Sequence, residues 1–88
     1  MLSFKEKQKI IEKFRHDDSD TGSSEIQIAL LSTEIKELSN HLKKHRKDNH
    51  SRRGLLKMVA KRRKLLQYLA REDNKRYETI IKKLELKK

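Results

Sequence analysis

Apolar residues recur every three or four positions along most of the chain, which is the spacing of one face of an α-helix. The pattern is clearest in one stripe, which runs through Ile28, Leu31, Ile35, Leu38 and Leu42. Three further stretches follow the same rule, and we expect helices over residues 4–15, 24–45, 50–72 and 74–85. The chain has no proline and only two glycines, so it lacks the turn residues that strands need between them. The sequence therefore predicts an all-α fold.

Polar residues at the expected helix ends support these bounds. Ser3 can cap the first helix while Glu6 bonds back to it, and Asp48 or Asn49 can cap the third helix. Residues 16–23 contain no apolar side chain and are rich in Asp, Ser and Thr, whose side chains bond their own backbone. We therefore expect a polar hinge loop there.

The four helices should form a single domain over residues 1–88, with the second and third helices in a long antiparallel hairpin and the shorter first and last helices packed on its apolar seam. If the turn is centred near residues 47 and 48, facing positions have numbers that sum to about 95. This register puts Gln27 opposite Tyr68 and His41 near Gly54. The predicted inward positions of the first, third and last helices are Phe4, Ile10, Ile11 and Phe14; Leu55, Met58, Val59, Leu66, Leu69 and Ala70; and Tyr77, Ile80, Ile81 and Leu84.

The charge is strongly positive and unevenly spread. The chain has 24 Lys and Arg against 13 Asp and Glu, a formal net charge of +11. Residues 43–64 hold eleven of these cations and a single carboxylate, Asp48. A solvated face would mix the two signs to limit self-repulsion, so this run indicates a polyanionic partner that neutralises it.

One edge of the third helix collects much of this charge around an aromatic ring. At about 100° per residue, six side chains fall within an arc of about 80°, opposite the apolar stripe. They are Arg53, Lys57, Lys61, Lys64, Tyr68 and Arg71. Tyr68 can serve as a stacking platform for a base or sugar, or it can pack under a neighbouring helix; the spacing allows both.

Two outward polar clusters follow from the hairpin register. One contains Thr21, Gly22, Gln27, Tyr68 and Arg71, and the other, at the hairpin tip, contains His41, Lys44, His45, Asp48, Ser51 and Arg52. Gln27 and His41 lie about 21 Å apart along their helix, enough for two separate contacts on one folded RNA.

Each cluster also has a purely structural interpretation. Asp48 and Ser51 can do no more than cap the third helix, and Gln27 can complete a capping box with Ser24 if the second helix begins there rather than at Ser23. Alternatively, Asp48 can accept a hydrogen bond from a guanine or cytosine amino group. Glycine inside a helix lowers its stability by about 1 kcal/mol relative to alanine. Its presence at position 54 therefore suggests a close approach by a neighbouring helix or a phosphate.

Other chemistry is poorly supported. His41, His45, His50 and Asp48 could nominally hold zinc, but there is no cysteine and the positive field opposes a cation. The chain is short for a deep catalytic cavity and shows no nucleophile, Walker or dinucleotide motif, so we expect no enzyme activity, metal, cofactor or small-molecule substrate. The charged N-terminus and the lack of an apolar run of about 18 residues argue against a signal peptide and a membrane span.

Four segments of the chain carry a family likeness: DTGSSEIQIALLS at 20–32, HLKKHRKDNHSRRGLLKMV at 41–59, RRKLLQYL at 62–69 and RY at 76–77. In this order, and over essentially the whole chain, they closely resemble the bacterial members of the uS15 family of small-subunit ribosomal proteins. The resemblance implies a four-helical, cytoplasmic ribosomal protein that binds the central domain of small-subunit ribosomal RNA. It would hold a three-way junction in one arrangement, so that platform proteins dock indirectly, through the folded RNA.

The resemblance also implies roles for particular residues. Its junction contacts map onto Thr21, Gly22, Gln27, Tyr68 and Arg71, and its second contact, to a shallow minor groove at a G-U/G-C step, maps onto His41, Asp48 and Ser51. We expect the surrounding cations to contact RNA phosphates: Lys44, His45, Arg52, Arg53, Lys57, Lys61 and Lys64. Some family members also contact large-subunit RNA from the tip, at an intersubunit bridge, and some repress their own messenger; the resemblance does not decide whether this chain does either.

Three positions depart from the family pattern. Glu85 replaces a glycine common near the C-terminus, Asn49 stands where a second histidine is frequent, and Glu34 puts a phosphate contact at its position in doubt. The alternative to a ribosomal role is a general basic helical protein that binds DNA or RNA without junction specificity, and a bundle with an acidic protein partner is a second rival.

Overall fold

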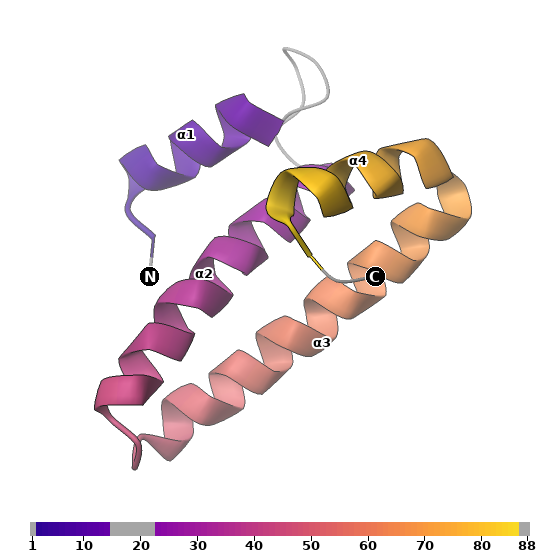
Figure 1. Cartoon of the computed structure of the whole chain (residues 1–88). Coiled ribbons are helices and arrows are strands. Elements are labelled where there is room, and N and C mark those ends of the chain that lie inside the picture. The colour runs from indigo at the N-terminus through magenta and orange to yellow at the C-terminus, as the bar shows by residue number, and fades with distance from the viewer. Residues whose placement is uncertain (1, 15–22, 87–88) are drawn as a thin grey trace.

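The computed structural model describes residues 2–14 and 23–86, which form four helices and, within that part of the chain, no strand. The helices are α1 (Phe4–Phe14), α2 (Ser24–Lys44), α3 (Asn49–Glu72) and α4 (Asn74–Leu84) (Figure 1). Each bound lies within one residue of the position predicted from the sequence, and the all-α prediction is confirmed. The predicted hinge loop falls almost wholly outside the described residues; only Ser23 is described.

Local capping explains where α1 and α2 begin. The Glu6 amide donates to Ser3 Oγ at 3.1 Å and the Ser3 amide donates to Glu6 Oε1 at 3.2 Å, which completes the expected capping box. These bonds lower the pKa of Glu6. Ser23 caps α2, because its hydroxyl accepts from the Ile26 amide at 3.3 Å. The capping box of Ser24 with Gln27 is therefore not the arrangement adopted.

The far end of the chain is closed by a turn with a positive φ angle. The Glu85 amide donates to the Lys82 carbonyl at 3.2 Å, and the Leu86 amide donates to the Ile81 carbonyl at 3.0 Å. This is the Schellman pattern, in which the residue after the helix takes the left-handed conformation. Glu85 does so with φ 54° and ψ 38°.

The hairpin of α2 and α3 has the predicted register to within a few residues. Arg62 Nη1 donates to Ser32 Oγ at 3.1 Å across the hairpin. A Cβ added at Gly54 would lie 3.8 Å from Leu38 Cδ2. Both pairs have position numbers that sum close to the predicted value, so the residues expected to face one another lie at matching levels.

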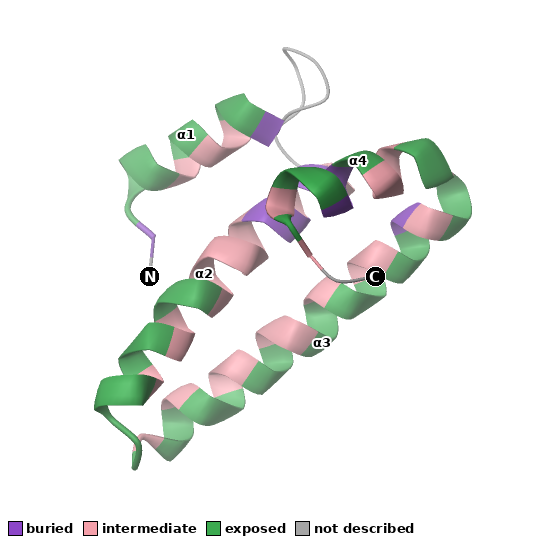
Figure 2. Cartoon of the chain, in the orientation of Figure 1, coloured by how far each residue is buried: buried purple, intermediate pink, exposed green. Residues whose placement is uncertain are grey.

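The core lies at the open end of this hairpin, where α1 and α4 also arrive. Figure 2 shows the buried positions gathered there, whereas the arm leading to the tip has only half-buried and exposed positions. Packing at one end leaves the tip as a two-helix projection. The buried apolar cluster comprises Phe14, Ile26, Ile28, Ala29, Leu69 and Ile80.

The predicted inward position of Phe4 is wrong. Its side chain is 75% exposed, whereas Leu2, just before α1, is 6% exposed. Phe4 lies in the first turn of α1, and at this end of the helix Leu2 is buried in its place. Helical spacing identifies a face of a helix but not which of the apolar residues near its end a neighbour covers.

Candidate nucleic-acid interface

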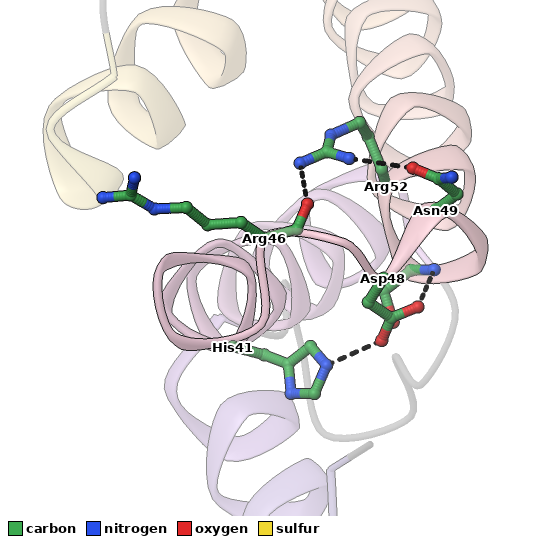
Figure 3. Close-up of polar contacts among 6 residues, drawn as sticks. His41, Arg46, Asp48, Asn49 and Arg52 are labelled. Atoms are coloured by element: carbon green, nitrogen blue, oxygen red, sulfur yellow. Dashed lines mark hydrogen bonds and ion pairs between the residues drawn. The ribbon is translucent and has the colours of Figure 1, made fainter.

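The structure brings His41, Asp48 and Ser51 together at the hairpin tip. Asp48 caps α3: its Oδ1 accepts from the Ser51 amide at 3.0 Å, and its Oδ2 accepts from Ser51 Oγ at 2.6 Å. His41, in the last turns of α2, contacts the same Oδ2 through Nε2 at 2.8 Å (Figure 3). The Asp48 carboxylate thus caps α3 and also forms the centre of the polar cluster. The two interpretations of Asp48 that the sequence allowed describe one arrangement.

This network keeps Asp48 ionised. The hydroxyl and amide of Ser51, followed by the His41 ring, hold the pKa of the Asp48 carboxyl well below its usual range. The side chains of His41 and Asp48 remain 41% and 31% exposed. The tip thus presents a fixed negative acceptor in the middle of the most basic segment of the chain.

His45 supports the His41 ring. The two imidazoles stack with their centroids 4.5 Å apart and an interplanar angle of 27°. The His45 amide also ends α2 by donating to the His41 carbonyl at 3.0 Å. His45, predicted as a phosphate contact, is thus placed where it also restricts the orientation of the ring that meets Asp48.

Arg52 is turned toward the tip rather than away from it. Its Nη2 donates to the Arg46 carbonyl at 2.7 Å and its Nη1 donates to Asn49 Oδ1 at 3.1 Å (Figure 3). The sequence indicated Arg52 only as a cation for RNA phosphates. The sequence does not predict the bond from Arg52 to the Arg46 carbonyl, because that bond depends on how α2 ends.

The basic edge of α3 has the exposure that the helical spacing predicts. All six of its side chains are exposed: Arg53, Lys57, Lys61, Lys64, Tyr68 and Arg71. Tyr68 is 49% exposed, so it is not buried beneath α1 or α4. A half-exposed ring among cations can stack on a base or sugar.

The second cluster is only partly described. Gln27 is half-buried near the start of α2, and the hairpin register places it level with Tyr68 on α3, where Arg71 follows one turn later. Thr21 and Gly22 lie outside the described residues. The open end of the hairpin thus carries three of the five predicted junction residues.

A groove lies between α2 and α3 beside the tip. It has a volume of about 480 Å³, and Glu34 and Glu37 line it together with Leu38, His41 and Gly54. Because two carboxylates line it, the groove does not continue the basic edge of α3, and a phosphate contact at Glu34 gains no support.

One contact between α2 and α4 has no signal in the sequence. Glu25 and Arg76 form an ion pair between α2 and α4, with Arg76 Nε 2.5 Å from Glu25 Oε2.

The described residues contain no group of three or more His, Asp or Glu side chains arranged to hold a metal ion. None of their helices is long and apolar enough to cross a membrane.

Known proteins of one family are similar to this chain in sequence. The family model described as ribosomal protein S15 matches residues 7–87. The small ribosomal subunit protein uS15 of Thermoanaerobacter sp. (strain X514) is 57% identical over 88 residues, covering 100% of both chains. That of Bdellovibrio bacteriovorus is 58% identical over 79 residues, covering 90% of this chain and 89% of the relative, and that of Francisella tularensis is 52% identical over 88 residues, covering 100% of both. This chain therefore belongs to the ribosomal protein S15 (uS15) family.

Proposed function

We propose that this protein binds the central domain of small-subunit ribosomal RNA and holds a three-way junction there in one arrangement. Two contacts would do so. Gln27, Tyr68 and Arg71 at the open end of the hairpin bind the junction together with Thr21 and Gly22, and the tip reads a nearby minor groove. Binding energy that exists only in the docked arrangement shifts the RNA population toward it.

The general part of this function follows from family membership. The chain is a structural constituent of the small ribosomal subunit, is located with it in the cytoplasm, and is not an enzyme. The proposal adds which RNA it binds and how.

The tip network is the observation that carries the proposal. A surface built only to attract phosphates could cap α3 with a neutral serine or asparagine. Asp48 caps it instead, and Ser51 and His41 hold that carboxylate in its charged form. Such an acceptor suits the N2 amino group of guanine, which is the base-edge donor that a minor groove presents. In A-form RNA the minor groove is wide and shallow, so the projecting tip can reach base edges there.

The exposed cations supply affinity rather than recognition. We assign phosphate contacts to Lys44, His45, Arg53, Lys57, Lys61 and Lys64, all of which are exposed on the tip or on the basic edge of α3. Contacts of this kind release counterions and depend steeply on salt. They position the protein while the two polar clusters specify the fit.

Two further roles belong to the same proposal. Once the junction is held, platform proteins dock on the folded RNA, so this protein nucleates their assembly without touching them. The tip projects beyond the core (Figure 1), which leaves it accessible to large-subunit RNA at an intersubunit bridge.

The alternative is a general basic helical protein that binds DNA or RNA without junction specificity. We would measure binding, at several salt concentrations, to the central-domain junction RNA, to the same RNA with the junction replaced by continuous helix, and to a B-DNA duplex of equal charge. A strong preference for the intact junction at every salt concentration is the expected result. Equal and steeply salt-dependent binding to all three would support the alternative.

A further inference from the structure

The turn between α2 and α3 is held from two sides. On one side, Asp48 joins His41 of α2 to Ser51 of α3. On the other, Arg52 of α3 reaches back over the turn to the Arg46 carbonyl at 2.7 Å (Figure 3). Arg46 lies in the turn, just past the end of α2, so this bond ties a side chain of α3 to the backbone of the turn.

We infer that Arg52 is a positioning residue, which sets the turn so that Asp48 points at the RNA minor groove, rather than one more phosphate contact. This inference rests on the proposed function of the tip. The Arg46 carbonyl that accepts from the Arg52 side chain lies two residues before Asp48. The Arg52 side chain thus holds the backbone of the turn close to the point at which Asp48 leaves it.

The guanidinium shape is what this role requires. Nη1 and Nη2 donate to different acceptors, Asn49 Oδ1 and the Arg46 carbonyl, and so use two of five N–H groups in a rigid fork. A lysine ammonium carries the same charge but presents it as a point on a flexible stem, so it cannot hold the two acceptors in the same way. A lysine at position 52 therefore separates the effect of the Arg52 charge on RNA binding from the effect of its two hydrogen bonds.

The test compares Arg52 with its neighbour Arg53, which is exposed on the basic edge of α3. RNA binding as a function of salt would be measured for Arg52→Lys, Arg52→Ala, Arg53→Lys and Arg53→Ala, with helix content checked by circular dichroism. We expect Arg52→Lys to weaken binding about three- to tenfold, with the salt slope unchanged, because two hydrogen bonds are lost and no charge is. At Arg53 we expect Ala to reduce the slope by about one unit and Lys to recover it.

A double-mutant cycle with Asp48→Asn shows whether Arg52 acts through Asp48. Asparagine can still cap α3 but is uncharged, so the tip remains folded. We expect the penalty of Arg52→Lys to disappear in the Asp48→Asn background.

Three outcomes would overturn the inference: Arg52→Lys binds like the unmodified protein, Arg52→Ala lowers the salt slope by about one unit and Lys restores it, or the penalty persists undiminished with Asp48→Asn. Each leaves the proposed function standing. That function fails separately, if the unmodified protein does not prefer junction RNA.

Discussion

The carboxylate of Glu25, in the first turn of α2, accepts two hydrogen bonds of 2.5 Å from the guanidinium of Arg76 in α4. The Glu25 side chain is 10% exposed, whereas the Arg76 side chain is 34% exposed. The two planar groups meet in the parallel geometry that gives arginine–carboxylate pairs their strength. The pair ties α4 to the start of α2, beside the core.

Replacing Arg76 by Ala should destabilise the protein by about 3 kcal/mol, because it leaves the buried Glu25 carboxylate without its charged partner. Urea unfolding followed by circular dichroism measures this change. Lys82→Ala, at an exposed position of the same helix, is the matched control and should change stability by no more than about 0.5 kcal/mol. Similar small effects for both variants would mean that the Glu25–Arg76 pair adds little to the free energy of unfolding.

Replacing Glu85 by Gly should stabilise the protein by about 1 kcal/mol. Glu85 adopts the left-handed conformation, which glycine accepts without the steric cost paid by residues with a Cβ. The thermal unfolding midpoint should rise. Lys82→Gly, inside α4, should lower it, and a fall for both variants would contradict the explanation.

Replacing Gly54 by Ala should also stabilise the free protein, by about 1 kcal/mol, since alanine is the better helix former. The added methyl group has room, because its nearest neighbour, Leu38 Cδ2, would lie at an ordinary contact distance of 3.8 Å. A close approach by the neighbouring helix therefore does not account for this glycine.

An approach by RNA is the remaining explanation of the two that the sequence suggested for Gly54. We expect Gly54→Ala to weaken RNA binding while it raises the unfolding midpoint. Unchanged RNA affinity in the stabilised variant would show that Gly54 has no role in binding.

Protonation of Asp48 should contribute to the loss of folding stability in acid. Its pKa is depressed in the folded state, so the unfolded chain takes up the proton first; the stabilisation is complete above about pH 4 and is lost as the pH falls below it. Thermal unfolding followed from about pH 6 to about pH 3 should show a shallower decline for Asp48→Asn. Ser51→Ala, which removes one donor, should have a smaller effect in the same direction, and parallel profiles for all three proteins would argue against this linkage.

Replacing Asp48 by Ala should weaken binding to junction RNA about tenfold, even though it makes the protein more positive. Lys57→Ala, on the exposed basic edge, is the comparison and should lower the salt slope by about one unit. Filter binding over a salt series distinguishes the two effects. Tighter binding by Asp48→Ala, with helix content intact, would mean that the carboxylate only repels phosphate.

The sequence by itself determined the four helices, their ends and the register of the hairpin, because apolar periodicity, capping groups and a short turn act over a few residues. It also placed Tyr68 on the basic edge of the third helix, although the structure was needed to show that the ring is exposed. It put His41, Asp48 and Ser51 at one tip, since the turn is short enough for the geometry of one helix to fix the register of the other.

Only the tertiary structure decided which apolar residues near the start of α1 are covered. Phe4 has the spacing of a core residue but is exposed, whereas Leu2, just before the helix, is buried. The Glu25–Arg76 pair joins positions 51 residues apart, and the turn of Arg52 toward Arg46 depends on where α2 stops. These contacts depend on the packing of whole helices in three dimensions, which no local pattern encodes.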